Sequence, residues 1–299
     1  MLFNGALLVD KNSGPTTAYI TRKISRLLGI KAGHAGTLDP LATGLAIVLL
    51  GKTTKLQRYF TAFKKSYTGT ARLGIETDSG DSQGKIVEEY SVEIEPESIY
   101  DFVGSLTGKQ MQIPPIFSAL RYRGKRAYKL ARNGQKVELQ PREIEIFAFE
   151  IDNIRLPYLD FKLEVSSGTY VRSIIQTLGQ QLGCGAHVCS LRRETIGSID
   201  VKSALSFEET RDYYNSGRIN EIIRKPIELM SDMPILDLDK NRGIDISHGK
   251  HIHLSEMNFN CGQKFAFAMD NRLLAIARWV DSKDKEYVYE RVLIGPGEV

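Results

Sequence analysis

Gly33-His34-Ala35-Gly36-Thr37-Leu38-Asp39-Pro40-Leu41-Ala42-Thr43-Gly44 is the stretch that decides the fold, and it combines glycines with an Asp-Pro pair. The glycines allow the backbone to turn sharply or to approach a ligand closely. Pro40 biases the backbone of Asp39 toward an extended conformation and has no N–H to donate. A carboxylate held in this way can be presented rigidly into a cleft. On these residues alone, an ordinary Asp-Pro turn is the alternative.

Apolar patterns on both sides of this stretch predict the elements that carry it. Residues 5–10 and 45–50 have the composition of buried strands. Residues 16–28 repeat apolar residues at helical spacing, and Gly29 follows as a C-cap. We therefore expect residues 30–43 to form a glycine-rich loop between a helix and a strand.

Farther along, strands and helices alternate without the regular period of a doubly wound fold. Strands are predicted at 66–74, 144–154, 159–166 and 186–192, with a turn at 76–84 and a helix at 170–182. This order predicts an α+β protein with a mixed, largely antiparallel sheet and helices packed on it.

The sequence pattern changes after Pro226, where short runs of alternating apolar and polar residues are separated by turn residues. Strands are expected at 264–268, 273–279 and 288–294. We therefore divide the chain into a catalytic domain, residues 1–233, and a small β-rich domain, residues 234–299.

Composition indicates a soluble globular protein: 299 residues, 42% hydrophobic, 25% charged, and a net charge of +4. The three cysteines lack C-x-x-C spacing, which favours free thiols. The first residues have no basic region typical of a signal peptide, and the longest apolar run, 45–50, is far shorter than the ~20 residues of a membrane helix. We expect a cytoplasmic protein with no membrane partner.

Two motifs suggest a cofactor or a metal, but both fail on inspection. Gly51-Lys52-Thr53 ends like a phosphate-binding loop, but Ala46 stands where the pattern needs glycine, and a strand precedes it. His248, His251 and His253, with Asp245 and Glu256 nearby, fit no zinc spacing. The sequence predicts neither a metal nor a cofactor.

The 33–44 stretch resembles the G-H-x-G-T-L-D-P-x-A-x-G signature of TruB-type pseudouridine synthases at every fixed position. The resemblance runs in order through residues 4–200, and includes the following segments: Gly5 to Lys11, Lys65-Ser66-Tyr67, Ala71 to Gly74, Pro114 to Leu120, Gly124 to Tyr128, Ser167 to Arg172, Gly185 to Val188 and Leu191-Arg192-Arg193. Asn12 and Thr17 depart from the family's proline and serine, and we expect them to reshape the first turn.

The resemblance implies a pseudouridine synthase fold followed by a PUA-like RNA-binding domain. It also implies an activity: the family converts uridine 55, in the T-loop of tRNA, to pseudouridine after flipping the base out of the loop. The basic tails of guide-RNA-dependent relatives are missing, so we expect a monomer that needs no guide RNA and binds the T-arm and the acceptor end of tRNA.

The family's site residues carry over to matching positions. Asp39 is implied as the catalytic carboxylate, either as a nucleophile or as a base, and Arg172 as the bidentate partner that keeps it ionised. Tyr67 is expected beneath the flipped uracil, where its ring supplies a stacking face. His34 is expected to occupy space vacated by flipped nucleotides or to stack on a neighbouring one, Leu191 to line the uracil pocket, and Lys11 to bind the substrate.

A basic segment, residues 121–136, gives an argument independent of the resemblance. It contains no acidic residue and places tyrosines among its cations, the composition of an RNA-clasping segment. In the family this region is a mobile thumb, here about residues 121–142, and its predicted RNA contacts are Arg121, Arg123, Lys125, Arg126, Lys129 and Arg132. Two other readings stay open, an RNA-folding protein without catalysis and a carboxylate enzyme for a small molecule.

Overall fold

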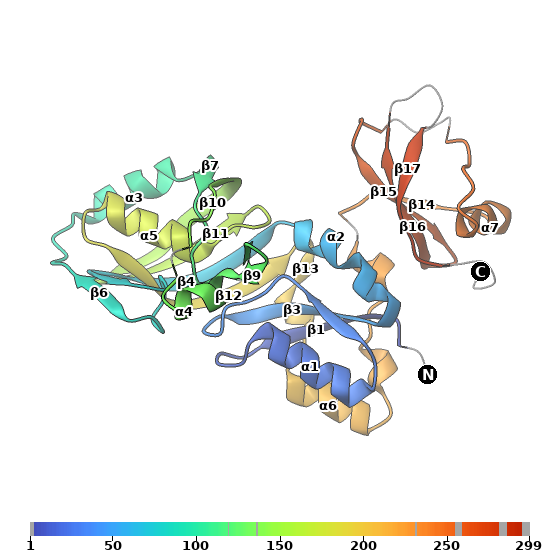
Figure 1. Cartoon of the computed structure of the whole chain (residues 1–299), viewed down its shortest axis with the longest axis horizontal. Helices are drawn as coiled ribbons and strands as arrows, with labels where there is room; N and C mark the ends of the chain where they lie inside the picture. The colour runs from blue at the N-terminus through green and yellow to red at the C-terminus, as the bar shows by residue number, and fades with distance from the viewer. Residues whose placement is uncertain are drawn as a thin grey trace.

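A computed structural model describes residues 3–118, 120–135, 137–230, 232–254, 259–280 and 286–294. The chain forms a large twisted sheet with helices around it, and a second, smaller sheet at the other end of the molecule (Figure 1). The architecture agrees with the predicted α+β class and its β-rich C-terminal part.

The main sheet has nine strands in the order β1-β3-β12-β4-β11-β10-β7, with β2 paired to β3 and β13 paired to β12. Its strands are β1 (Gly5–Lys11), β2 (Ala32–Ala35), β3 (Thr43–Leu50), β4 (Lys65–Leu73), β7 (Gly108–Gln112), β10 (Arg142–Arg155), β11 (Tyr158–Val165), β12 (Ala186–Ile196) and β13 (Ile199–Asp200). All of these pairings are antiparallel except β12 with β3, which are parallel and meet through only two residue pairs, Arg192 with Thr43 and Arg193 with Gly44.

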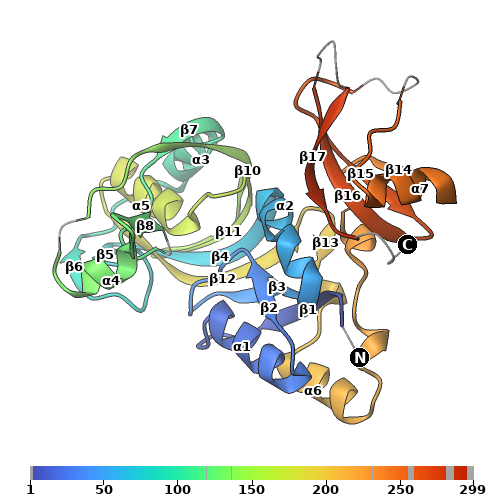
Figure 2. The same ribbon diagram turned by 45° about the vertical axis from the view of Figure 1, so that its right-hand side comes forward.

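One end of this sheet is covered by α1 (Thr17–Leu28) and α6 (Phe207–Asn215), which lie together below β1 and β3 in Figures 1 and 2. The Thr16 side chain caps the first turn of α1, and Gly29 ends the helix in the left-handed region at φ 64°. Ile20, Ile24 and Leu28 repeat at helical spacing and are buried against β1 and β3. Each such side chain stabilises the fold by about 1.5–3 kcal/mol.

The other end of the sheet packs against α3 (Pro96–Ser105) and α5 (Val171–Gln181). Apolar residues of both helices form a separate core with β4, β10, β11 and β12. Shorter elements connect these parts: η1 (Gly51–Leu56), α2 (Gln57–Ala62), β5 (Ile75–Thr77), β6 (Ile86–Glu89), η2 (Val201–Ser203), η3 (Ile219–Glu221) and η4 (Pro226–Leu229).

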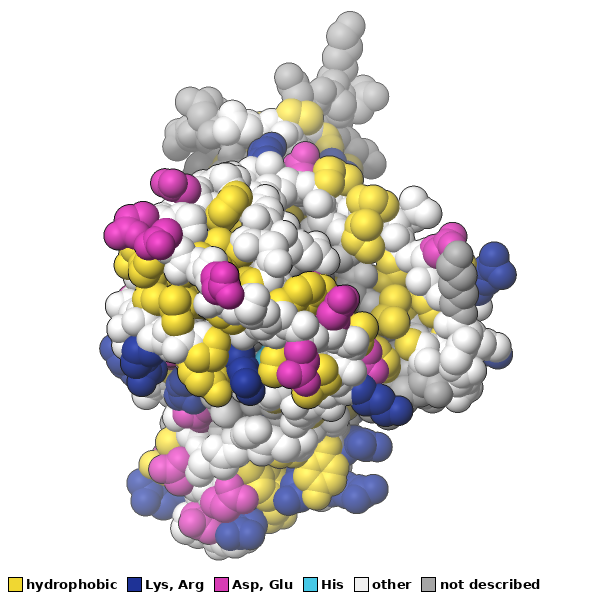
Figure 3. Space-filling view, turned by 90° about the vertical axis from the view of Figure 1, so that its left-hand side faces the viewer, with side chains coloured by type: hydrophobic (Ala, Val, Ile, Leu, Met, Phe, Trp, Pro, Cys, Tyr) yellow, Lys and Arg dark blue, Asp and Glu magenta, His cyan; other side chains and the backbone are white. Residues whose placement is uncertain are grey.

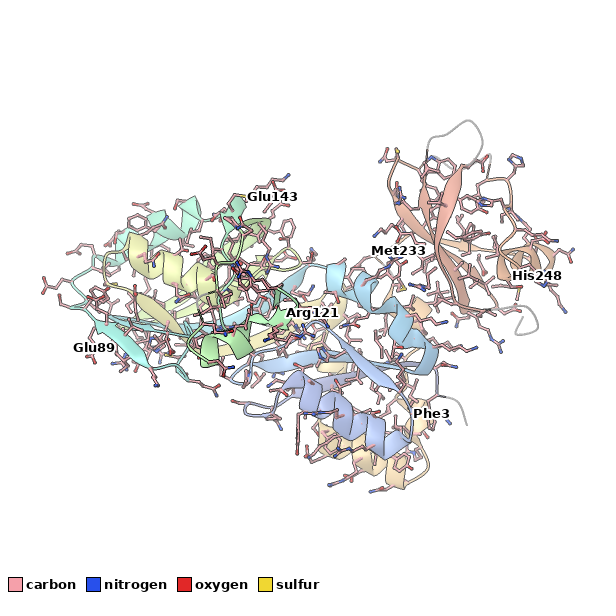
Figure 4. The ribbon with its side chains drawn as sticks, viewed as in Figure 1. Phe3, Glu89, Arg121, Glu143, Met233 and His248 are labelled. Carbon is pink, nitrogen blue, oxygen red and sulfur yellow. The ribbon has the colours of Figure 1, made fainter. Side chains whose placement is uncertain are left out.

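The second sheet has the order β14-β15-β16-β17, and α7 (Lys240–Ser247) packs on it. Its strands are β14 (Ile235–Asp237), β15 (Lys264–Met269), β16 (Arg272–Trp279) and β17 (Tyr287–Val292). Met233, labelled in Figure 4, lies between the two sheets and packs against a hydrophobic cluster that contains Leu229, Met230 and Ile276. Residues on both sides of the predicted boundary therefore share one cluster, and a division at residues 233 and 234 stays a prediction.

Most predicted strands and helices are present, and the structure also contains elements that the sequence did not predict, among them α3 and α6. Ala32–Ala35 forms a strand inside the predicted loop because its backbone pairs with β3. The β-rich C-terminal part contains the helix α7, which Asp239 caps. Within the described residues, no helix is long and apolar enough to cross a membrane.

Candidate active site

Asp39 lies in the loop that joins β2 to β3, and the residues around it are anchored on both sides. The Thr17 hydroxyl accepts the Leu38 N–H at 2.9 Å and donates to the Leu38 carbonyl at 3.3 Å. Lys11 donates to the carbonyls of Pro40 and Ala42 just after the aspartate. Thr17, which replaces the family's serine, therefore holds the residue before the carboxylate through its hydroxyl.

Two apolar side chains also fix this loop. Leu38 and Leu41 flank Asp39 and are buried in the core that includes Val171 and Ile174 of α5. The strands that the loop joins, β2 and β3, pack in a core with β1 and α2. Leu38 and Leu41 instead insert into the separate core that contains α5. Asp39 is thereby carried to the start of α5.

The Asp39 carboxylate meets Arg172, the second residue of α5. Arg172 donates from Nε to Asp39 Oδ2 at 2.8 Å and from Nη2 to Oδ1 at 3.1 Å. The guanidinium is itself fixed by donation to the carbonyls of Ser79, at 2.6 Å, and Phe117, at 3.0 Å. The Arg172 side chain is only 3% exposed whereas that of Asp39 is 30% exposed, so the carboxylate is the member of the pair that a ligand can reach.

A second carboxylate, Asp81, lies beside this pair. Its Oδ2 is 3.8 Å from Arg172 Nη1, and its Oδ1 accepts hydrogen bonds from the Ser79 hydroxyl and the Gln83 N–H. Burial raises the pKa of Asp39 above its ordinary value, the Arg172 guanidinium opposes that rise, and Asp81 adds to it. One arginine thus serves two carboxylates, of which Asp39 has the closer contact.

Tyr67 and Leu191 lie on adjacent strands, β4 and β12, with their side chains on the same face of the sheet. Both are buried, at 8% and 6% exposure, in the core that contains Leu38 and Leu41. They therefore pack in the same core as the leucines of the Asp39 loop, and their role in lining a uracil pocket stays a prediction.

His34 precedes the loop on β2 and Lys11 binds it from β1, and burial lowers the pKa of both. Burial lowers the pKa of His34, and the positive charges of Arg193 and Arg126 lower it further, while its Nδ1 is buried without a hydrogen-bond partner. Burial also lowers the pKa of Lys11 to about 8, against the opposing effect of Asp39. His34 is thus held as a neutral ring near the thumb residue Arg126.

The thumb begins as a hairpin of β8 (Arg121–Tyr122) and β9 (Lys125–Arg126), followed by α4 (Ala127–Arg132). Arg123 and Gly124 both have positive φ, 49° and 80°, as a tight two-residue hairpin turn requires. Figure 1 draws this hairpin and α4 in green in front of the central strands, and Figure 4 labels Arg121 there. The side chains of Arg121, Arg123, Lys125 and Arg126 are exposed, and those of Lys129 and Arg132 lie outside the described part.

The basic character of the thumb is not shared by the whole surface. The end of the molecule away from the second sheet shows Lys and Arg together with acidic and hydrophobic side chains (Figure 3). Among the described residues, no group of three or more His, Cys, Asp or Glu is placed to hold a metal ion.

The structure pairs Asp39 with Arg172, attaches Lys11 to the loop after Asp39, and buries Tyr67 and Leu191 in one core with Leu38 and Leu41. His34 lies on β2, before the loop, and feels the charges of Arg193 and Arg126. Sequence reasoning missed Asp81, Thr17 and Arg193. Asp81 falls in a stretch interpreted only as a turn, and no local pattern marks a carboxylate that meets an arginine 91 positions later in the chain. The roles of all these residues stay predictions.

Comparison with known families agrees with this geometry. Residues 22–171 match the N-terminal domain of TruB family pseudouridylate synthases, and residues 172–230 match the tRNA pseudouridylate synthase B C-terminal domain. The tRNA pseudouridine synthase B of Aquifex aeolicus is 38% identical over 86% of this chain and 89% of its own length. That of Endomicrobium trichonymphae is 44% identical over 76% of this chain and 96% of its own.

Solved structures show the same fold at lower identity. A chain from the crystal structure of a Cbf5-Nop10-Gar1 complex superposes with a TM-score of 0.78 at 21% identity, covering 98% of this chain and 86% of that one. The pseudouridine synthase fold predicted from the sequence is therefore confirmed. From these matches, together with the Asp39 loop and its arginine, we conclude that the chain belongs to the TruB family of pseudouridylate synthases.

Proposed function

We propose that this protein is an enzyme that isomerises a uridine of tRNA to pseudouridine, and that the target is uridine 55 in the T-loop. The observation that carries the proposal is the partly exposed Asp39 carboxylate, held at both oxygens by a buried arginine in a chain of this family. The relatives named above act on tRNA according to their names.

The reaction breaks the bond between uracil N1 and ribose C1′, turns the base and joins its C5 to C1′. A proton leaves C5 and another is bound at N1, so the product is an isomer and nothing is consumed. Because the target base is enclosed in a folded loop, it must flip out before Asp39 can reach it. Asp39 starts the cleavage, either as a nucleophile or as the base that removes the 2′ proton.

The surrounding residues suit this task. Arg172 keeps Asp39 ionised through two charge-assisted hydrogen bonds. Tyr67 and Leu191 form the wall against which the flipped uracil rests, and the neutral His34 fills space among the nucleotides around it. Lys11 and Thr17 hold the loop that presents the carboxylate.

RNA contacts outside the site come from two other parts. The exposed cations of residues 121–126 bind phosphates of the T-arm, and the second sheet, as a PUA-like domain, binds the acceptor end. We propose that one chain suffices and that no guide RNA takes part.

A chemical assay for pseudouridine on an unmodified tRNA transcript tests the proposal. The enzyme alone should modify uridine 55, and a transcript with cytidine at position 55 should stay unmodified. Refolding of the RNA without any pseudouridine would favour an RNA-folding protein. Neither binding nor modification of tRNA would favour an enzyme acting on a small molecule.

A further inference from the structure

Arg193 is a fully buried arginine that the proposed mechanism does not use. It lies on β12 with 1% of its surface exposed. Its Nε donates to the Leu45 carbonyl at 2.7 Å and its Nη2 to the Gly36 carbonyl at 3.1 Å. Within the described part of the chain, no carboxylate forms an ion pair with it. The guanidinium is thus a buried charge held by backbone oxygens.

The side chain that Arg193 meets is Tyr67. The two residues stand directly opposite each other on β12 and β4, so their side chains share a face of the sheet. Burial lowers the pKa of Arg193, and the Tyr67 phenol opposes that shift, so the two side chains interact across the strands. Since a planar guanidinium has donors in fixed directions, its bonds to the Leu45 and Gly36 carbonyls fix how it lies beside Tyr67.

The same group also joins Tyr67 to the Asp39 loop. Gly36 and Leu45 lie on either side of the loop, and Arg193 binds a carbonyl from each. At Gly44 a Cβ atom would lie 2.3 Å from the Arg193 carbonyl oxygen, so the two backbones touch at the loop's end. One side chain, which stands opposite Tyr67, is therefore bonded to both ends of the segment that carries Asp39.

This arrangement is costly, which argues against a merely structural use. Burying a guanidinium without a carboxylate is unfavourable, and a neutral amide can donate to two carbonyls at lower cost. The cost extends to neighbours: burial, the larger cause, and the charge of Arg193 together lower the pKa of Lys65 to about 7. What a neutral residue cannot do is bind two carbonyls through a planar fork and also place a positive charge beside the phenol.

We propose that Arg193 is a positioning residue for pseudouridine formation, which holds the Tyr67 hydroxyl in place relative to Asp39. The expected effect on catalysis rests on the proposed function, whereas the interaction between Arg193 and Tyr67 can be tested without measuring turnover. The variants are Arg193→Lys, which keeps the charge but loses the planar guanidinium, and Arg193→Gln, which keeps N–H donors but loses the charge. Arg192→Lys is the matched control, because Arg192 points to the opposite face and pairs with Asp10.

The first measurement is NMR of protein carrying ¹³Cζ-labelled tyrosine. The resonance that disappears in Tyr67→Phe identifies Tyr67. It should shift in both Arg193 variants and stay in place in Arg192→Lys. An unshifted resonance in folded Arg193 variants overturns the proposal, and so does the failure of both variants to fold, because Arg193 then serves folding.

The second measurement is a double-mutant cycle with single-turnover rates and tRNA affinities. Each Arg193 variant should slow pseudouridine formation at least ~10-fold, with its Kd within about twofold of wild type. In the Tyr67→Phe background the same change should cost less than about twofold, since the hydroxyl it positions is gone. Equal losses in both backgrounds overturn the inference and leave the proposed function standing. A wild-type protein that forms no pseudouridine overturns the proposed function, while the NMR result still decides the contact.

Discussion

Arg172 binds both carboxylate oxygens of Asp39, at 2.8 and 3.1 Å, although 133 positions separate the two residues in the chain. Arg172 lies in the first turn of α5. Asp39 lies in the loop between β2 and β3, on the other side of the parallel pairing of β12 with β3. The pairing orients a carboxylate whose pKa burial raises, and the Arg172 guanidinium opposes that rise.

Asp39→Asn keeps the shape of the side chain but removes its charge and basicity. We expect turnover to fall at least ~10³-fold, or about 4 kcal/mol of lost transition-state stabilisation. Binding should survive, because affinity comes mainly from the basic surface and base stacking. Single-turnover pseudouridine formation and filter binding measure the two effects. A variant that retains a tenth of wild-type turnover would show that Asp39 is not the catalytic group, and joint loss of turnover and binding would assign it a structural role.

Thr17→Val should destabilise the protein, because it leaves the Leu38 N–H without its acceptor in a buried position. The expected loss is about 1–3 kcal/mol of unfolding free energy. Thr17→Ser keeps the hydroxyl and should lose no more than about 1 kcal/mol for the missing methyl group. Urea denaturation of both variants measures this difference. Equal stabilities would mean that the hydroxyl does not hold the loop.

Stability should rise with pH across the titration of Lys65. Burial lowers its pKa from 10.5 to about 7 in the folded chain, so between these values the unfolded chain binds a proton that the folded chain does not. The unfolding free energy therefore increases with pH between about 7 and 10.5. Below pH 7 Lys65 is protonated in both states and adds no pH dependence. Lys65→Met should reduce the slope by up to about 1.4 kcal/mol per pH unit.

Lys64→Met is the control for the pH experiment, since Lys64 is exposed and pairs with Glu164 at the surface. It should leave the slope between pH 7 and 10 as in wild type. Chemical denaturation at several pH values gives the slopes. If Lys65→Met and wild type had the same slope, Lys65 would be charged in the folded protein throughout.

Neutralising Arg123, Lys125 and Arg126 should weaken tRNA binding and flatten its dependence on salt. These side chains are exposed on the thumb hairpin, where phosphates can reach them. The slope of log affinity against log salt should fall by up to about one for each lost contact. The comparison variant neutralises three exposed cations outside the thumb: Lys202, Arg211 and Lys225. An unchanged slope in the thumb variant would contradict the thumb's assignment as an RNA contact.

Removing residues 236–299 should leave a folded protein that still modifies an isolated T-arm stem-loop, with lower affinity for full-length tRNA. Stability should fall, because Leu229 and Met230 lose their packing against Ile276 of the second sheet. Circular dichroism on heating and stem-loop turnover provide the measurements. A truncated chain that is unfolded or inactive would make the second sheet part of the catalytic unit.

Strong apolar periodicity made much of the fold predictable. The helix at 17–28 and the strands at 43–50 and 158–165 carry their patterns in the sequence itself. The strand Ala32–Ala35 does not, because alanine, glycine and histidine become a strand only by pairing with β3. The helix α7 was missed because its charged and glycine residues give a weak apolar stripe.

The candidate site was predictable to the extent that a family signature marks it. Asp39, Tyr67 and Arg172 were identified through the resemblance, and physical reasoning alone left an Asp-Pro turn open. Asp81 and Arg193 depend on contacts between distant segments, with Ser79 and Arg172 in one case and with Gly36 and Tyr67 in the other. A single sequence contains no local signal for such contacts.

The burial of Leu38 and Leu41 has a mechanical consequence. The main sheet consists of two halves joined by only two residue pairs, yet these leucines insert into the core of the half that holds Arg172. Asp39 is thus tethered to both halves, through Thr17 and Lys11 on one side and through these leucines and Arg172 on the other.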